Sequence, residues 1–155
     1  IIIYGFSLID TCNPLMPDCE ADNFYLWDSY EYSKEISFLL MPICMIFLVA
    51  SKMKSNIKKV VPHPMLIGVL IWSFVHLLST GDLRAIILFL SFAAYSIIDL
   101  IFTKKTGGNE ISYSIANDIV VIVVSLVLYS IILYFHEYVS GVQIVEKGNL
   151  LFFLP

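Results

Sequence analysis

Long apolar runs separated by short polar stretches are the main feature of this sequence. Four such runs cover residues 36–51, 64–80, 85–103 and 119–135. A helix needs about 17–25 residues to cross the hydrocarbon core of a bilayer, and these runs lie at the short end of that range. Apolar and polar residues do not alternate along the runs, which excludes a β-barrel, so spans in lipid must be helices. The pattern predicts an all-α, polytopic transmembrane helical bundle with about four full crossings.

The remaining segments divide the chain further. Residues 1–9 are apolar, and we interpret them as the tail of a truncated transmembrane helix. Residues 10–35 form an acidic, aromatic extramembrane loop, the bundle occupies 36–145, and 146–155 form a C-terminal tail. Only 14% of the residues are charged and 59% are hydrophobic, whereas soluble domains carry about 25% charged residues. A soluble fold is therefore excluded.

The charges are segregated between the two sides of the predicted bundle. Because consecutive spans alternate in direction, loops 52–63 and 104–110 share one side, and they hold six of the nine basic residues. The other side holds loop 10–35 and ten of the thirteen carboxylates. The positive-inside rule then assigns the lysine-rich loops to the cytoplasm or matrix, and loop 10–35 to the periplasm or intermembrane space. We expect the protein in a bacterial or mitochondrial inner membrane.

The acidic loop contains two cysteines, Cys12 and Cys19. On an oxidising side of the membrane the pair is a candidate disulfide, and the alternative is two unpaired thiols. Two cysteines without a neighbouring histidine in sequence are a weak signature for a metal site.

Three histidines lie at helix ends or inside a helix. His63 directly precedes the second run, and His76 follows thirteen residues later, which is about 20 Å along a helix axis. His136 directly follows the fourth run. The third run returns the chain to the lysine-rich side and the fourth run crosses again, so His76 and His136 lie on the same, acidic side. These two side chains can approach each other, whereas His63 and His76 cannot share one iron.

Polar residues recur along the helices that carry these histidines. Trp72 and His76 are four residues apart, and Tyr129 precedes His136 by seven, spacings that favour one helix face. One interpretation is an internal pocket in which His76 and His136 are axial ligands of a haem, with His63 a weaker metal candidate. The other is that such residues allow helices to approach and form hydrogen bonds, and for His63 a helix-start or headgroup role.

Two stretches carry a family resemblance. Residues 63–83 read HPMLIGVLIWSFVHLLSTGDL, which resembles the signature of the NnrU family of membrane proteins. In that signature a His-Pro start leads through a tryptophan and an internal histidine to a Gly-Asp turn. Residues 129–141 read YSIILYFHEYVSG, similar to the family's closing Tyr…His…Gly motif. The resemblance covers most of residues 54–145.

The NnrU family includes bacterial proteins linked to nitrogen-oxide metabolism and the plastid zeta-carotene isomerase, a haem b enzyme. The resemblance therefore implies haem b with histidine ligation among His63, His76 and His136. It also implies that the bound haem supports redox or isomerase chemistry.

A non-catalytic role is the competing hypothesis. The chain is short and no catalytic motif stands out, so no catalytic residue is named. It would then be an accessory or structural subunit of a larger membrane complex, such as a respiratory-chain assembly. Four aromatic residues of the acidic loop have the composition of an interface or of a headgroup-level belt: Tyr25, Trp27, Tyr30 and Tyr32. The lysine-rich loops are typical of contact with anionic lipid in the bilayer, and we expect no nucleic-acid partner.

Three aspartates lie at predicted helix ends. Asp82 directly precedes the third run and is well placed to cap its first turn. Asp99 and Asp118 lie near the lysine-rich side, and we expect them to pair with Lys104 or Lys105.

Overall fold

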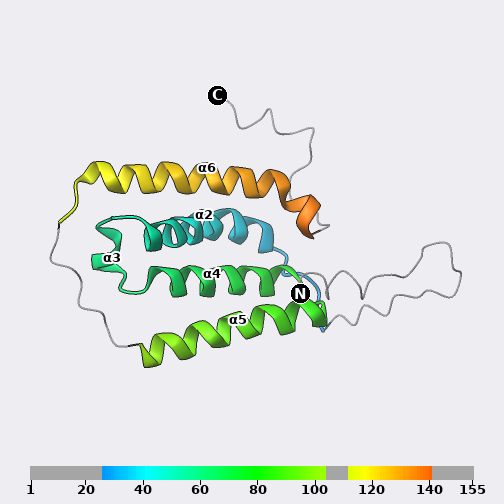
Figure 1. Cartoon of the computed structure of the whole chain (residues 1–155). Coiled ribbons are helices and arrows are strands. Elements are labelled where there is room, and N and C mark those ends of the chain that lie inside the picture. Colours follow the sequence, from blue (N-terminus) through cyan, green and yellow to red (C-terminus); the bar gives the residue numbers. More distant parts are fainter. Residues whose placement is uncertain (1–25, 104–111, 141–155) are drawn as a thin grey trace, which may run out of the picture.

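The computed structural model describes residues 26–103 and 112–140 (Figure 1). The expected helix tail at 1–9, most of the acidic loop with Cys12 and Cys19, and the C-terminal tail lie outside the described residues. The regular structure within these ranges is helical: α2 (Ser33–Lys52), α3 (Ile57–Val60), α4 (Pro64–Ser79), α5 (Leu83–Phe102) and α6 (Ile115–Ser140). The predicted all-α helical bundle is confirmed.

Three helices are long and apolar enough to cross a membrane. They are α2, α5 and the part of α6 from Ile115 to Tyr138. Helix α4 is apolar but has only 16 residues, which corresponds to about 24 Å at 1.5 Å per residue. That length is less than the hydrocarbon core of about 30 Å. The four expected crossings are therefore three long helices and one shorter apolar helix.

Helices α2 and α4 form the centre of the bundle. Helix α6 packs against α2 and helix α5 packs against α4, which gives the spatial order α6, α2, α4, α5 (Figure 1). The two outer helices turn large apolar side chains outward, such as Ile101 at 71% exposed and Ile119 at 55%. Such extended apolar surface is unfavourable in water, whereas lipid accommodates it.

The central helices approach closely at Gly68 of α4. A Cβ atom added there would lie 3.2 Å from the Cys44 carbonyl oxygen and 3.2 Å from the Leu48 side chain. The Cys44 thiol donates a hydrogen bond of 3.2 Å to the Gly68 carbonyl oxygen. Small residues allow helix backbones to approach in this way, and they are enriched at helix interfaces in membranes.

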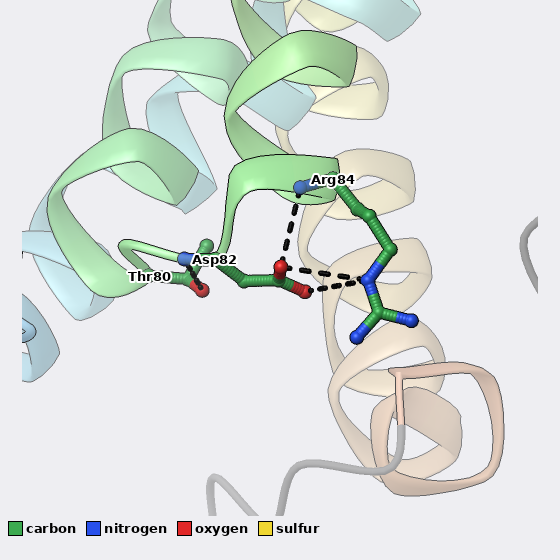
Figure 2. Close-up of polar contacts among 3 residues, drawn as sticks. All are labelled: Thr80, Asp82 and Arg84. Carbon is green, nitrogen blue, oxygen red and sulfur yellow. Dashed lines mark hydrogen bonds and ion pairs between the residues drawn. The ribbon is translucent and has the colours of Figure 1, made fainter. Parts of the chain in front are cut away.

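Helix α5 begins with a side-chain cap. Asp82 Oδ1 accepts a hydrogen bond of 3.2 Å from the Arg84 backbone N–H, and Asp82 Oδ2 lies 3.4 Å from Arg84 Nε in an ion pair. The Asp82 N–H donates to Thr80 Oγ1 at 3.3 Å, as Figure 2 shows. The expected cap at Asp82 is confirmed, and it turns the chain sharply from α4 into α5.

The other two aspartates have partners close by in the fold. Asp118 accepts hydrogen bonds from Asn56, and Asp99 Oδ1 accepts one of 2.8 Å from Thr103 Oγ1. The expected partners, Lys104 and Lys105, lie outside the described residues. Their pairing with the aspartates stays a prediction.

Candidate functional site

The three histidines are divided between the two ends of the bundle. His63 immediately precedes α4, and His76 lies in the last turn of the same helix. Helix α6 runs in the same direction as α4, so His136 lies near the end that carries His76 (Figure 1). The structure thus places His76 and His136 at one end of the bundle and His63 at the other.

His76 is held in a defined orientation by its own helix. Its Nδ1 lies 2.8 Å from the carbonyl oxygen of Trp72, one turn earlier. Because a carbonyl oxygen only accepts, Nδ1 carries the proton of this hydrogen bond. In the neutral imidazole the lone pair is then on Nε2. A backbone carbonyl that orients a histidine through one ring nitrogen, with the other nitrogen facing a metal, is the usual arrangement of a metal-ligating histidine.

Aromatic rings surround His76. Its imidazole stacks on Phe89 of α5, with centroids 4.5 Å apart and an interplanar angle of 30°. Trp72 lies 4.9 Å from His76 and meets Phe89 edge-on at 4.9 Å. Phe92 also meets Trp72 edge-on, at 5.5 Å. His76 is therefore seated between its own helix and α5, in an apolar setting that fixes the plane of the ring.

Sequence reasoning found Trp72 and His76 but missed Phe89 and Phe92. The two phenylalanines are three residues apart, a spacing that favours one helix face. Their signal in the sequence was weak, because phenylalanine in an apolar run is equally typical of a lipid-facing position. Only the packing of α5 on α4 selects these two as neighbours of the histidine.

His136 has a partner one turn later in its own helix. Its Nδ1 lies 2.9 Å from the Ser140 hydroxyl oxygen, and the same hydroxyl donates to the His136 carbonyl oxygen at 2.9 Å. Tyr129 lies two turns before His136 and is partly buried. Both residues lie on α6, whereas Trp72 and His76 lie on α4, and these two helices are not among the pairs that pack closely in the described part of the chain.

No larger cluster of metal ligands accompanies the pair. Among the residues that the structure describes, no group of three or more His, Cys, Asp or Glu side chains could hold a metal ion. Cys44, the one cysteine in the described ranges, is buried and free. Two histidines suffice for a haem iron, because the porphyrin supplies the four equatorial nitrogens.

A comparison with known protein families shows which family this chain is related to. The family described as NnrU protein matches residues 15–144, which is most of the sequence. The chain belongs to the NnrU protein family. The family match includes all three histidines and every described helix, so the resemblance seen in residues 63–83 and 129–141 is confirmed. No match is found among curated proteins or solved structures.

A pocket on another face of α4 adds a second surface to this NnrU-family chain. It has a volume of about 390 Å³ and is lined by Trp27, Asp28, Tyr30, Phe74, Leu77 and Leu78. The segment before α2 forms one wall, because the Trp27 indole N–H donates to the Leu77 carbonyl oxygen at 3.2 Å. The Tyr30 N–H similarly donates to the Leu78 carbonyl oxygen at 3.0 Å. Neither His76 nor His136 lines this pocket.

Proposed function

We propose that this NnrU-family membrane protein binds haem b, and that His76 and His136 would hold its iron. The observation that carries the proposal is the hydrogen bond between His76 Nδ1 and the Trp72 carbonyl, at 2.8 Å. It leaves Nε2 as the ligating nitrogen of a neutral imidazole. The position of His136 at the same end of the bundle supports a paired arrangement.

The donor set fits a haem better than another metal group. A zinc site needs three or four protein ligands, and the described residues contain no cluster of that size. When bound, haem would supply one-electron redox or Lewis-acid chemistry for redox or isomerase reactions on a substrate in the membrane.

The protein's own part is to orient its ligands and to exclude water. The Trp72 carbonyl and the ring of Phe89 fix the plane of His76. Ser140 holds His136 in the same manner from its own helix. Apolar side chains on the surrounding helix faces keep the environment of low polarity, and this setting tunes the reduction potential of a bound haem.

The membrane orientation is part of this proposal. Lys52 and Lys58 lie at the end of the bundle where α4 begins, opposite the end that carries His76. The positive-inside rule assigns that lysine-rich end to the cytoplasm or matrix. The histidine pair then faces the periplasm or the intermembrane space of an inner membrane. The variants Lys54→Cys and Tyr30→Cys, each at an exposed position, test this orientation by thiol labelling from each side of sealed vesicles. Labelling of both cysteines from the same side contradicts the proposed orientation.

An absorbance spectrum of the purified protein tests the haem proposal. We expect a Soret band in the full chain after haem loading, and its loss or a shift in His76→Ala and His136→Ala. His63→Ala is the matched control, since His63 lies at the other end of α4, and it should keep the band. If His63→Ala abolishes the band and His76→Ala does not, the assignment of ligands is wrong.

One observation favours a second candidate function, an accessory subunit of a larger membrane assembly such as a respiratory-chain complex. Three aromatic side chains before α2 are exposed, namely Trp27 at 42%, Tyr30 at 52% and Tyr32 at 56%. Exposed aromatic residues are enriched at interfaces. On this hypothesis, Trp27→Ala with Tyr30→Ala releases stoichiometric partners during purification in mild detergent. A chain that purifies alone from its native membrane in both forms contradicts it.

A further inference from the structure

A pocket of about 350 Å³ opens at the end of the bundle where α2 and α5 end and α4 begins. Pockets that bind small ligands start at about this size. Its lining includes Lys52, Lys58, His63, Leu66, Asp99 and Thr103. The pocket lies at the opposite end of α4 from His76, so it is separate from the candidate haem site.

Two lysines give the pocket its positive charge. Lys52 lies in the last turn of α2 and Lys58 lies in α3. Neither ammonium group forms an ion pair within 4 Å among the described residues. Asp99 also lines the pocket, so the two lysines leave it with a net positive charge, which favours an anionic group.

The start of α4 adds backbone donors to the same pocket. Pro64 is the first residue of the helix, and the His63 side chain makes no capping hydrogen bond. The next two amides, those of Met65 and Leu66, meet no acceptor in the described part of the chain, and both residues line the pocket. Free amides at a helix start, together with the helix dipole, form a binding site for anionic groups.

The His63 side chain gives an independent indication that a ligand binds in this pocket. Its Nε2 is buried and forms no hydrogen bond with the described residues. Buried polar atoms in native proteins are almost always hydrogen-bonded. His63 lines the pocket, and an anion oxygen there would accept a hydrogen bond from the Nε2–H tautomer of the imidazole.

We infer that this pocket binds a phosphate group, carried by a phospholipid headgroup or present as free phosphate. Lys52, Lys58 and the two amides of α4 would face the phosphate oxygens. Asp99 lines the pocket as well, and its Oδ1 accepts a hydrogen bond of 2.8 Å from Thr103. A carboxylate beside an anion site suits a headgroup that carries an ammonium group, as phosphatidylethanolamine does, and it disfavours a free dianion.

Two binding measurements on the full chain distinguish the sources. Native mass spectrometry of the delipidated protein in detergent measures the binding of added phosphatidylethanolamine. Thermal unfolding in the same detergent, with increasing inorganic phosphate, measures the binding of free phosphate. Lys52→Gln and Lys58→Gln should each weaken binding by about fivefold, the effect of one basic residue near an anionic headgroup. Circular dichroism checks that both variants keep their helices.

Lys54→Gln is the matched control, because Lys54 is an exposed residue of the same connection and does not line the pocket. It should bind within twofold of the parent chain. Weakened lipid binding in the two pocket variants supports a headgroup, and weakened binding of inorganic phosphate supports the free ion. Equal losses in all three variants mean diffuse surface attraction and overturn the inference, as does unchanged binding of both ligands in Lys52→Gln and Lys58→Gln.

Discussion

Asn56 and Asp118, 62 residues apart, are joined by two hydrogen bonds of 2.8 Å, one from the Asn56 backbone N–H and one from its side-chain amide. The same amide donates to the Tyr113 carbonyl oxygen at 2.9 Å and accepts from the Tyr113 N–H at 3.0 Å. This cluster fastens the connection between α2 and α4 to the start of α6. Since α6 otherwise meets α2 through side-chain packing, these hydrogen bonds fix its position along the bundle.

Removing the Asn56 side chain should destabilise the protein. Asn56→Ala keeps the backbone hydrogen bond to Asp118 but removes the side-chain amide that bonds to Asp118 and Tyr113, and we expect a loss of about 1–3 kcal/mol in the free energy of unfolding. Thermal unfolding in detergent, followed by circular dichroism, measures the loss. Asn117→Ala is the control, because Asn117 precedes Asp118 in the first turn of α6 and takes no part in the hydrogen bonds of this cluster. An equal effect in both variants would show that the cluster has no special role.

Enlarging Gly68 should separate the two central helices. Gly68→Leu forces a side chain against the Cys44 carbonyl and Leu48, which a Cβ alone already approaches to 3.2 Å. Overpacking of this kind costs about 1–3 kcal/mol. The midpoint of unfolding in a denaturing detergent should fall accordingly. Ala94→Leu, at an exposed position on α5, should leave the midpoint unchanged, and a Gly68→Leu protein as stable as Ala94→Leu would contradict the close helix approach.

The contribution of the Asp82 cap to stability can be measured separately from that of the ion pair between Asp82 and Arg84. Asp82→Ala removes both the acceptor for the Arg84 N–H and the ion pair, and loss of an N-cap costs about 0.5–2 kcal/mol. Asp82→Asn keeps an oxygen that caps the helix and removes only the charge, which is worth about 0–1 kcal/mol in a partly exposed pair. Chemical unfolding should therefore rank Asp82→Asn close to the parent chain and Asp82→Ala below it. The reverse order would mean that the charge matters more than the cap.

Phe89 should affect haem binding while Phe92 should not. Phe89 stacks directly on His76, whereas the ring contact of Phe92 is with Trp72. On the proposal that His76 ligates haem, Phe89→Leu loosens the ligand and should weaken haem affinity by about tenfold, the lower end for residues that orient a metal ligand. Haem titration followed at the Soret band measures the affinity. Equal affinities of Phe89→Leu and Phe92→Leu would remove Phe89 from the site.

Apolar runs in the sequence located the helices but not all of their ends. The fourth run begins at residue 119, whereas α6 begins at Ile115. The run excludes Asn117 and Asp118 because they are polar, yet both are helical, and Asp118 finds its partner in Asn56. At the other end, α6 continues past His136 to Ser140. An apolar run marks the part of a helix that suits lipid, and a helix can extend beyond that part wherever its polar groups are hydrogen-bonded.

The helical membrane class follows from the residues alone, because the length and continuity of an apolar run are local properties of the chain. The same holds for the cap at Asp82, which needs only the next two residues. The order of the helices, the stacking of Phe89 on His76 and the link between Asn56 and Asp118 came only with the folded chain. Lipid tails are as apolar as leucine, so hydrophobicity does not tell a helix which neighbour to choose. That choice depends on close packing and hydrogen bonds between residues far apart in sequence, as at Gly68 and Cys44.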